Sequence, residues 1–392
     1  MQKNKKLKKK INILYIYPIH QFSGSLKSLQ EYLKILPKKK YNFYFIAPFG
    51  KASKILSKFG LVIKALGITK FDITNIGHYR GARWLILIRE IFYIFPTLYS
   101  CLVLKIYQKK IDIIHLNDST ALPIIFFLKI FYNSKIILHV RSVLKKKDNY
   151  ISSFIFSIIE KYVDKIIVID NTVKNSLTSN QKSTVIRNII VHKKNIKKKG
   201  GAYLKIGYIG SLLKFKGVED LIFVTQQLIN EKFKIKLYLA GNKVHKNYFI
   251  ISKLLKIFNI NNDIYETNKE NNNIIFMQQI DNIEKFYEKI DVLVFPSYIN
   301  ALGRSVFEAG CFSIPSIVCL DKRYSDSFIK NYSGLSFSRP GDRPALRNAI
   351  KFFYNNRKMI TKMGINANKI FIKNFSPERN LHKLEKIYKE LS

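Results

Sequence analysis

The sequence is poor in cysteine, arginine and acidic residues, and each shortage narrows the choice of protein class. Its 392 residues include 3 cysteines, an odd number with no C-x-x-C spacing. A disulfide scaffold and a cysteine-based metal site are therefore not expected. The thiols of Cys101, Cys311 and Cys319 lie among apolar residues, so we expect them to be buried in a protein of a reducing compartment.

Acidic residues are scarce relative to basic ones: 26 Asp and Glu stand against 68 Lys and Arg, which gives a formal net charge of +42. Only 12 of the basic residues are arginines. Arginine is the residue that reads base edges and binds phosphate with two parallel hydrogen bonds, so a nucleic-acid-binding protein is disfavoured. Lysine, isoleucine and asparagine are abundant together, as AT-rich coding would produce. The excess charge is either compositional or selected for an anionic partner.

Long hydrophobic runs are also missing. The longest apolar stretch without a charged residue, 91–104, contains Pro96, and it is shorter than the ~20 residues that a membrane-spanning helix needs. We expect a core or interfacial helix pair there. A basic tail precedes an apolar run at 11–17, but no small-residue cleavage site follows, so we expect a first β-strand instead of a signal peptide. With 47% hydrophobic and 14% aromatic residues, the chain is too apolar for a disordered polycation.

Short apolar runs alternate with helix-period segments along the chain, which predicts an α/β fold with parallel sheets covered by helices. A lysine-rich segment with two glycines, 193–201, separates two series of such runs and is the expected linker. We expect doubly wound domains at 1–192 and 202–375, with a C-terminal helix at 376–392. Strands are expected at 11–17, 43–47, 111–115, 135–140, 165–170, 204–209, 236–240, 274–277, 291–295 and 316–319.

Ligands of open α/β sheets bind at the carboxyl ends of the strands, so the loops that follow strands hold the candidate residues. In the loop at 210–217, glycine lets the backbone approach a phosphate and Lys216 supplies a positive charge. The alternative for this loop is an ordinary turn with solvated lysines. Residues 301–304 open a later helix and can present backbone amides to an anion. Glu308 follows among apolar neighbours, where a carboxylate is more often functional or paired.

In this order, the segments resemble the retaining nucleotide-sugar glycosyltransferases of GT-B fold, the bacterial "group one" family (family four of the sequence classification). The resemblance rests on the G-x(5)-K-G loop at 210–217, on D-V-L-V-F-P-S at 291–297 and on the end of an E-x(7)-E region at Glu308. In the first half, S-G-S at 23–25, D-I-I-H at 112–115 and L-H-V-R at 138–141 also look like family landmarks. The resemblance implies two Rossmann-like domains that face each other across a cleft.

The resemblance also implies roles for individual residues. The enzyme would be a metal-independent hexosyltransferase with no cofactor besides its nucleotide-diphosphate-sugar donor, and the sequence contains no D-x-D pair. His139, Lys216 and Glu308 are the expected catalytic residues, and Arg141 is expected to bind the acceptor. The bland alternative for His139 is a capped or core histidine. The donor is expected to contact Gly24, Gly210, Ser211, Lys216, Asn300, Ala301, Leu302, Gly303, Arg304 and Glu308.

Two positions depart from the family pattern. Asn300 stands where the first acidic residue of the pair is expected, and its amide can still donate and accept hydrogen bonds. Ser211 stands where a basic residue usually follows the glycine, which removes one of two cations expected at the diphosphate. Arg304 is the residue that can compensate for this loss.

The resemblance places the enzyme in capsule polysaccharide or lipopolysaccharide biosynthesis. We expect it in the cytoplasm or at the inner face of the cell membrane, with a saccharide or lipid-linked acceptor, an anionic membrane surface as a further partner, and no nucleic acid. The alternatives are a nucleotide-sugar epimerase or another GT-B enzyme, and a non-catalytic basic nucleic-acid-binding protein.

Overall fold

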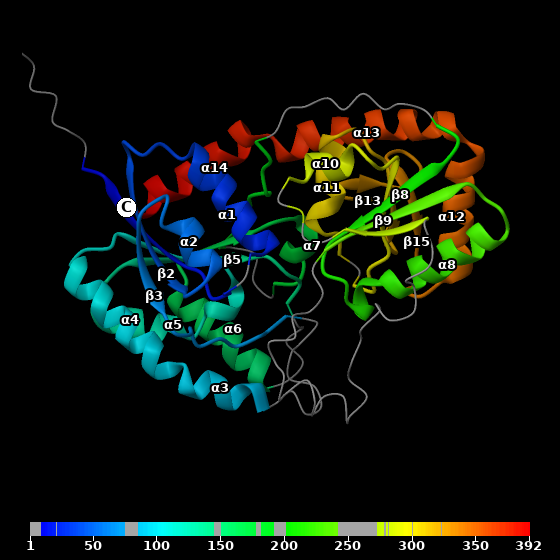
Figure 1. Cartoon of the computed structure of the whole chain (residues 1–392). Coiled ribbons are helices and arrows are strands. Elements are labelled where there is room, and N and C mark those ends of the chain that lie inside the picture. The colour runs from blue at the N-terminus through cyan, green and yellow to red at the C-terminus, as the bar shows by residue number, and fades with distance from the viewer. Residues whose placement is uncertain are drawn as a thin grey trace, which may run out of the picture. The chain divides into compact units, whose positions relative to one another are not determined.

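The computed structural model describes residues 9–20, 22–74, 85–144, 150–177, 182–191, 201–241, 273–277, 280, 282–299, 301–322 and 324–392. The chain forms two compact units (Figure 1). The N-terminal unit consists of Met1–Val191 together with Ser376–Ser392, and the C-terminal unit is His192–Phe375. The expected linker at 193–201 lies outside the described residues except for Gly201.

A seven-stranded parallel sheet forms the centre of the N-terminal unit, in the order β3-β2-β1-β4-β5-β6-β7. Successive side chains of β1 point to opposite faces, and both faces are covered by helices, so the strand is apolar except for Asn12 near its start. The strands are β1 (Ile11–Ile16), β2 (Tyr41–Pro48), β3 (Leu61–Ala65), β4 (Ile113–Leu116), β5 (Lys135–Val140), β6 (Lys165–Val168) and β7 (Ser183–Val185).

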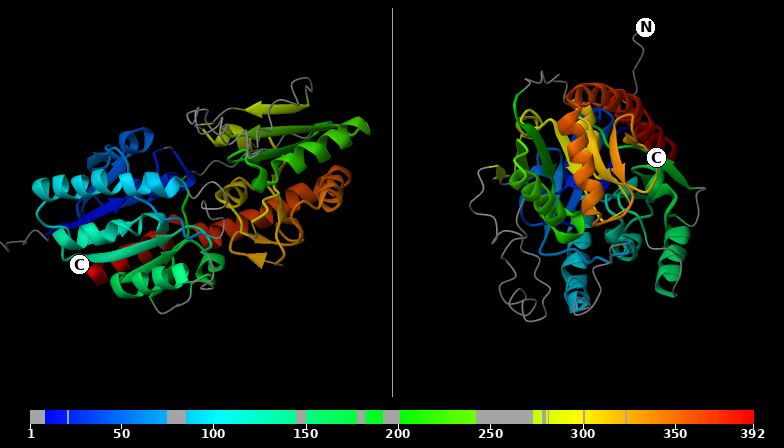
Figure 2. Two further views of the ribbon diagram at one scale, coloured as in Figure 1. Left: turned by 90° about the horizontal axis from the view of Figure 1, so that it is seen from below. Right: turned by 90° about the vertical axis from the view of Figure 1, so that its right-hand side faces the viewer.

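Helices cover both faces of this sheet (Figure 1 and Figure 2). One face, with Leu14 and Ile16, packs against α4 (Ile94–Tyr107), α5 (Ile124–Phe131) and α6 (Tyr150–Tyr162). The other face, with Ile13 and Tyr15, packs against α1 (Gly24–Ile35), α2 (Lys51–Leu56) and α14 (Pro377–Leu391). The remaining helical segments of this unit are α3 (Ile86–Phe92), η2 (Ser119–Ala121) and α7 (Asn171–Lys174).

Aspartates that precede strands fix the register with the neighbouring strand. The Asp112 carboxylate accepts a hydrogen bond from the backbone N–H of Asn12 in β1 at 2.8 Å. Asp291 accepts one from the N–H of Lys205 in β8 at 2.9 Å, and Asp164 serves β5 in the same way. These carboxylates satisfy backbone donors at the ends of the sheets, where no further strand residue could do so.

The C-terminal unit contains a six-stranded parallel sheet in the order β10-β9-β8-β11-β12-β15, and a small antiparallel pair, β13 and β14. α8, α12 and α13 pack on one face of the larger sheet, and α10 and α11 pack on the other. The elements are β8 (Leu204–Ile209), η3 (Lys214–Lys216), α8 (Val218–Asn230), β9 (Ile235–Ala240), β10 (Ile274–Met277), α10 (Glu284–Tyr287), β11 (Val292–Phe295), α11 (Arg304–Cys311), β12 (Ser316–Cys319), β13 (Tyr324–Ser325), β14 (Phe328–Ile329), β15 (Gly334–Phe337), α12 (Arg343–Asn355) and α13 (Arg357–Phe375).

The expected α/β class with two Rossmann-like halves is confirmed. Every strand expected from the sequence is present, and four of them, 135–140, 204–209, 274–277 and 316–319, have the expected bounds. The strands that were not expected include β3, β7 and β15, which all lie at sheet edges. Edge strands are short or half-exposed, as Leu61 with 43% exposure illustrates, so they lack the continuous apolar run that marks a central strand.

Candidate active site

Two loops at the carboxyl ends of neighbouring strands meet in the C-terminal unit. The first joins β8 to α8 and the second joins β11 to α11. Gly217 has a φ of 71°, and a Cβ on this residue would lie 2.1 Å from the carbonyl oxygen of Pro296. The backbone N–H of Tyr298 donates a hydrogen bond to the carbonyl of Phe215 at 2.9 Å. The glycine therefore permits a backbone contact that holds the two loops together.

Lys216 lies at this junction between two aromatic rings. Its ammonium nitrogen is 5.3 Å from the ring centre of Phe215 and 5.7 Å from that of Phe295. No carboxylate of the described residues lies within 4.0 Å of it. Burial lowers the pKa of Lys216, because removing a cation from water disfavours the charged form. Such a cation gains strongly from an anionic ligand. Lys214, in the same turn, is exposed.

Gly210 and Ser211 begin the first loop. Gly210 has a φ of 154°, and its carbonyl would lie only 1.8 Å from a Cβ on Gly241. The loops after β8 and β9 thus pass each other with no room for a side chain. Ser211 is exposed, and its carbonyl accepts a hydrogen bond from the Tyr208 hydroxyl at 2.8 Å.

The second loop leads into α11. Ala301, Leu302 and Gly303 are half-buried, and Gly303 is the N-cap of the helix, where no side chain makes a capping hydrogen bond. A Cβ on Gly303 would lie 2.8 Å from the Phe295 ring, so this turn packs closely on the end of β11. An uncapped first turn presents backbone amides to a ligand. Asn300 lies outside the described residues.

Glu308 and Arg304 form an ion pair on α11. The Arg304 Nε donates to the Glu308 Oε1 at 2.7 Å, and the two side chains are 13% and 5% exposed. The Tyr287 hydroxyl donates to the second carboxylate oxygen, Oε2, at 3.2 Å. Burial and the carboxylate raise the pKa of Tyr287 well above its ordinary value. Both oxygens of Glu308 are thus engaged by protein groups.

A polar cluster that no sequence pattern predicts supports the second loop. Arg343 at the start of α12 donates through Nε to the Asp220 Oδ1 of α8 at 2.7 Å. The Tyr298 hydroxyl donates to the other oxygen, Oδ2, of the same carboxylate. Burial, and then the bond to Asp220, raises the pKa of Tyr298 to about 12. These residues are far apart in the sequence and match no motif, so only the fold reveals the cluster.

In the N-terminal unit, Gly24 is exposed at the start of α1, and a Cβ there would meet no atom within 4 Å. Ser23 is the N-cap and accepts a hydrogen bond from the Leu26 N–H at 3.3 Å. Its hydroxyl also bonds the Tyr17 hydroxyl at 2.7 Å. Hydroxyl groups therefore fix the start of α1, and space remains beside its glycine.

His139 on β5 belongs to a buried polar chain. Its Nδ1 is 3.3 Å from the Nε2 of His115, whose Nδ1 is 2.8 Å from the Tyr388 hydroxyl. That hydroxyl lies 2.5 Å from the one of Tyr15. Burial lowers the pKa of His115 to about 3 and that of His139 well below its ordinary value, with Arg141 acting in the same direction. Both imidazoles are neutral near pH 7, and the His139 Nε2 has no hydrogen-bond partner within the described chain.

Arg141 follows β5 and binds two asparagines. Its Nε donates to the carbonyl of Asn117 at 2.9 Å, and its Nη2 donates to the Asn117 side-chain oxygen at 2.7 Å. Its Nη1 donates to the Asn188 side-chain oxygen at 3.0 Å. The guanidinium therefore ties the loop after β4 to the segment after β7, next to His139.

The structure thus brings Gly210, Ser211, Lys216 and the 301–308 segment together on adjacent loops of the C-terminal unit, while Gly24, His139 and Arg141 belong to the N-terminal unit. Residues 191–370 match the family described as "Glycosyl transferases group 1". This match covers most of the C-terminal unit, and the chain as a whole has the GT-B fold of its structural neighbours.

Named glycosyltransferases are also among the relatives and solved structures that the chain resembles. The chain is 24% identical over 183 residues to the capsular polysaccharide biosynthesis glycosyltransferase CapM of Staphylococcus aureus. The aligned region covers 47% of this chain and 45% of CapM, less than half of each. It is 22% identical over 310 residues to the O-antigen biosynthesis glycosyltransferase WclY of Escherichia coli, covering 74% of this chain and 82% of WclY. Anabaena Alr3699/HepE in complex with UDP-glucose superimposes with a TM-score of 0.71 at 13% identity, covering 97% of this chain and 100% of that one.

Proposed function

We propose that the chain transfers a sugar, with retention of its anomeric configuration, from a nucleotide-diphosphate sugar to a saccharide or lipid-linked acceptor in the synthesis of a surface polysaccharide. The observation that carries this proposal is the position of Lys216. A half-buried cation with no carboxylate partner among the described residues lies at the carboxyl ends of β8 and β11, beside the uncapped start of α11. CapM and WclY are named for capsule and O-antigen synthesis, which supports a role in a surface polysaccharide such as capsule or lipopolysaccharide.

The proposed clamp for the leaving diphosphate has two parts. The ammonium group of Lys216 supplies charge, and the first turn of α11 after Gly303 supplies backbone amides. Both are fixed in place before the reaction, and such preorganised groups stabilise the negative charge that develops on the leaving diphosphate. The exposed hydroxyl of Ser211 adds a neutral hydrogen-bonding group where a cation was expected. Asn300 is proposed to contact the sugar hydroxyls or a phosphate of the donor.

Arg304 and Glu308 are proposed to act as a pair. A guanidinium has five N–H donors, so Arg304 can hold Glu308 and a phosphate oxygen at once. Each carboxylate oxygen accepts more than one hydrogen bond, so Glu308 can accept a ribose hydroxyl while it retains Arg304 and Tyr287. A ribose contact by Glu308 therefore does not require the ion pair to break.

On the acceptor side, His139 is proposed to contact the sugar through Nε2, which is buried without a partner in the described chain. The Asn117 Nδ2 is likewise buried without a hydrogen-bond partner in the described chain. A neutral imidazole and an amide suit uncharged hydroxyl groups. Arg141 positions Asn117 and remains the proposed contact for an anionic group of the acceptor, and Gly24 leaves room for a ligand at the start of α1.

A matched pair of lysine variants tests the proposal. Lys216→Met should weaken binding of a UDP-, ADP- or GDP-sugar at least tenfold in calorimetric titration, or ~1.4 kcal/mol. Lys214→Met, which removes an exposed charge from the same turn, should change binding less than threefold. If no nucleotide sugar binds to or reacts with the wild-type protein, the proposed function is wrong. Equal losses in the two variants would instead remove Lys216 from the clamp.

Product analysis separates the transferase from an epimerase on the same fold, because an epimerase needs no acceptor. We expect the donor sugar to be consumed only with a saccharide or lipid-linked acceptor present, and the new linkage to keep the α or β configuration of the donor in the NMR spectrum. Inversion would remove the retaining mechanism. Metal independence remains a prediction, and EDTA should leave the transfer rate unchanged.

A further inference from the structure

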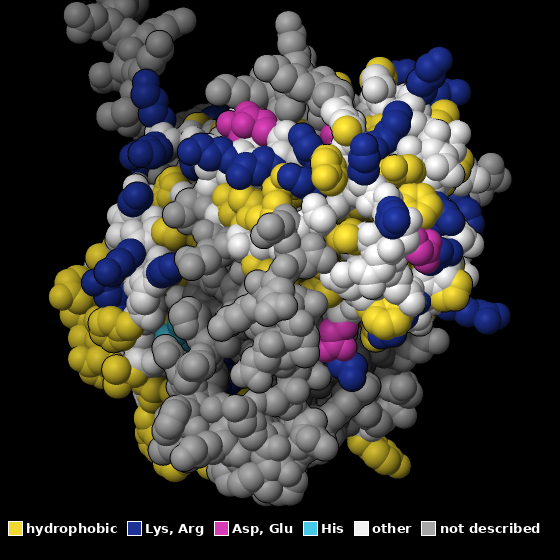
Figure 3. All heavy atoms as spheres, turned by 45° about the vertical axis from the view of Figure 1, so that its right-hand side comes forward, with side chains coloured by type: hydrophobic (Ala, Val, Ile, Leu, Met, Phe, Trp, Pro, Cys, Tyr) yellow, Lys and Arg dark blue, Asp and Glu magenta, His cyan; other side chains and the backbone are white. Residues whose placement is uncertain are grey.

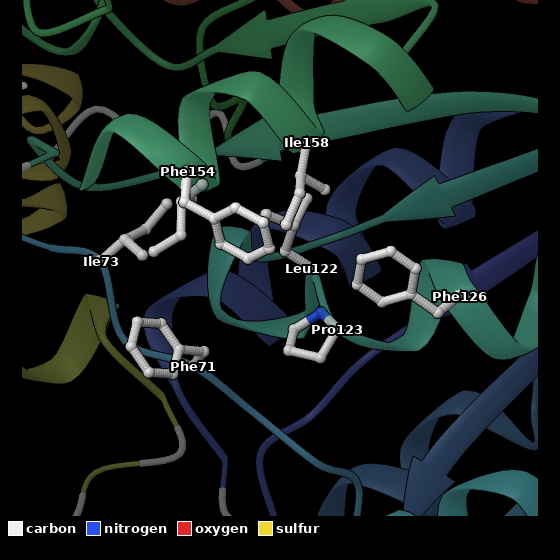
Figure 4. A pocket seen from close by; sticks show the side chains of 8 residues that line it. Phe71, Ile73, Leu122, Pro123, Phe126, Phe154 and Ile158 are labelled. Atoms are coloured by element: carbon white, nitrogen blue, oxygen red, sulfur yellow. The ribbon is translucent and has the colours of Figure 1, made fainter. Parts of the chain in front are cut away.

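The N-terminal unit contains a pocket whose lining is entirely apolar. Its volume is about 350 Å³, which is within the range of roughly 300–1,000 Å³ that small-molecule sites occupy. Figure 4 shows its aromatic rings and aliphatic side chains around one common space. The lining residues are Phe71, Ile73, Leu122, Pro123, Phe126, Phe154, Ile155 and Ile158. A pocket without polar groups selects a hydrocarbon over a sugar or a nucleotide.

The pocket lies at the edge of the sheet where the acceptor is expected. In a parallel sheet, the helix that follows a strand begins at the carboxyl end of that strand. Leu122 lies just before α5 and Phe126 lies in its first turn, and α5 follows β4. Phe154 lies in the first turns of α6, which follows β5. Arg141 and Asn117 directly follow the same two strands. A ligand bound in the pocket can therefore extend its polar end toward that pair.

The helices beside the pocket expose an unusual amount of apolar surface. Phe92, Phe95, Tyr99 and Ile106 on α3 and α4 are 67%, 72%, 68% and 76% exposed. Figure 3 shows hydrophobic side chains gathered over α3 and α4. On α5, Ile130 is 71% exposed, and α4 packs against α5. Large exposed apolar surfaces mark protein or membrane interaction sites.

This surface is suited to lying on a membrane. By length and composition alone, the segment Ile86–Tyr107, with a mean hydropathy of 1.6, could cross a bilayer, and 22% of it is buried in the structure. However, Thr97, Cys101 and Leu104 form a buried stripe of α4 against the sheet. Inserting α4 across a bilayer would uncover the core at that stripe. An interfacial position keeps the stripe packed and places the exposed side chains in lipid.

Charge favours a lipid surface over a second protein copy. Lys109 and Lys110 are exposed directly after α4, and Lys161 is exposed near the end of α6. The acid of α3, Glu90, is 5% exposed and paired with Arg89. A surface that combines apolar side chains with exposed lysines suits a bilayer, in which anionic headgroups cover a hydrocarbon core. Two copies of a chain with net charge +42 would instead repel each other.

We propose that the pocket holds one hydrocarbon chain of a membrane lipid, isoprenoid or acyl, and so delivers a lipid-linked acceptor to the carboxyl edge of the N-terminal sheet, while the α3–α4 surface rests on the bilayer. The proposal rests on the transferase function stated above and names its acceptor class. Binding of a chain should strengthen about fourfold with each further buried methylene, as expected for removal of apolar area from water.

Titration calorimetry with the full chain and monomeric probes tests the pocket. The probes are decyl phosphate, dodecyl phosphate and farnesyl phosphate. The pocket variant is Phe126→Ser/Phe154→Ser, whose side chains are 43% and 66% exposed, so folding should be retained. Ile372→Ser, 61% exposed on α13 of the C-terminal unit, is the control.

We expect the wild type and the control to bind dodecyl phosphate roughly fifteenfold tighter than decyl phosphate, and the pocket variant to lose at least tenfold for all chains. A preference for farnesyl phosphate identifies an isoprenoid source, and a preference for dodecyl phosphate identifies an acyl source. Absence of chain binding, or equal binding by the pocket variant and wild type, overturns the proposal.

Sedimentation with phosphatidylglycerol-containing vesicles tests the surface. Phe95→Ser/Tyr99→Ser should lower vesicle binding while affinity for the monomeric probes is unchanged, and unchanged vesicle binding would refute the α3–α4 contact. Binding of UDP-, ADP- and GDP-sugars is measured on the same samples. Intact binding of one of these donors without chain binding refutes the pocket and leaves the proposed function standing, whereas chain binding with no donor binding refutes the proposed function alone.

Discussion

Replacing Arg304 by methionine should destabilise the C-terminal unit, because it leaves the Glu308 carboxylate without its partner in the ion pair. The side chains are 13% and 5% exposed, and the Arg304 Nε lies 2.7 Å from the Glu308 Oε1. Two unit charges roughly 4 Å apart attract by about 4 kcal/mol at an effective dielectric constant of about 20. Removing one partner of a buried pair typically costs about 3–5 kcal/mol, since the remaining charge stays buried. We expect about 3 kcal/mol for Arg304→Met.

A double-mutant cycle isolates the pair. Glu308→Gln removes the charge and keeps a group that can accept from Tyr287, so we expect a loss of about 1–2 kcal/mol. Arg304→Met/Glu308→Gln should be more stable than the sum of the single losses predicts, by about 2 kcal/mol. The exposed i,i+4 pair Lys386–Glu390, with side chains 70% and 49% exposed, is the control. Lys386→Met should cost less than about 0.5 kcal/mol.

Calorimetric unfolding gives the required stabilities. A loss of 3 kcal/mol should lower the transition temperature of the C-terminal unit by about 6–12 °C. A shift below 2 °C for Arg304→Met, or additive losses in the cycle, would refute the assignment of a buried ion pair that stabilises α11. Equal shifts for Arg304→Met and Lys386→Met would show that burial does not strengthen the interaction.

Two further predictions concern the histidines and a glycine. Burial lowers the pKa of His115 to about 3 and also lowers that of His139, so the unfolded chain takes up protons below pH ~6.5 that the folded chain does not. The free energy of unfolding should therefore fall by about 2.5 kcal/mol between pH 7 and pH 5.5. In thermal unfolding, His115→Gln/His139→Gln should reduce this pH dependence, whereas replacement of the exposed His382 by Gln should leave it unchanged. Equal slopes for the wild type, the double variant and His382→Gln would contradict the prediction. Gly217→Ala places a Cβ 2.1 Å from a carbonyl oxygen at a φ of 71°, so we expect at least about 2 kcal/mol of destabilisation and weaker UDP-sugar binding. Gly201→Ala, where a Cβ meets nothing within 4 Å, should change stability by less than about 0.5 kcal/mol, and equal effects of the two alanines would show that the loops can separate.

The sequence predicts the loops of the C-terminal unit well because their signals are local. Each central strand is a short apolar run, and the glycine and lysine spacing of 210–217 fixes which residues follow β8. The fold then places Gly217 against Pro296 and Lys216 against Phe295. That contact follows from the pairing of β8 with β11, which the doubly wound pattern already implies.

Local sequence patterns do not predict contacts between segments that are distant in the chain. Arg343 meets Asp220 across 123 positions, and neither residue stands in a motif. His139 was expected to contact sugar, but its stacking on His115 depends on which face of β5 it occupies. The sequence of a strand that is apolar on both faces does not show which face a given side chain occupies. The alternation of polar and apolar residues that would distinguish the two faces is missing.

The C-terminal helix has a consequence for synthesis of the protein on the ribosome. Tyr388 of α14 bonds Tyr15 across 373 positions, and both side chains are buried in the N-terminal unit. At about 5–20 residues per second, the ribosome needs roughly 10–40 s to proceed from Val191 to the end of the chain. During that time α14 does not yet cover the sheet face that carries Ile13 and Tyr15. The C-terminal unit can fold without α14, because this helix belongs to the N-terminal unit. Nascent chains that lose their final turns should therefore leave the first-made unit incomplete and the last-made unit intact.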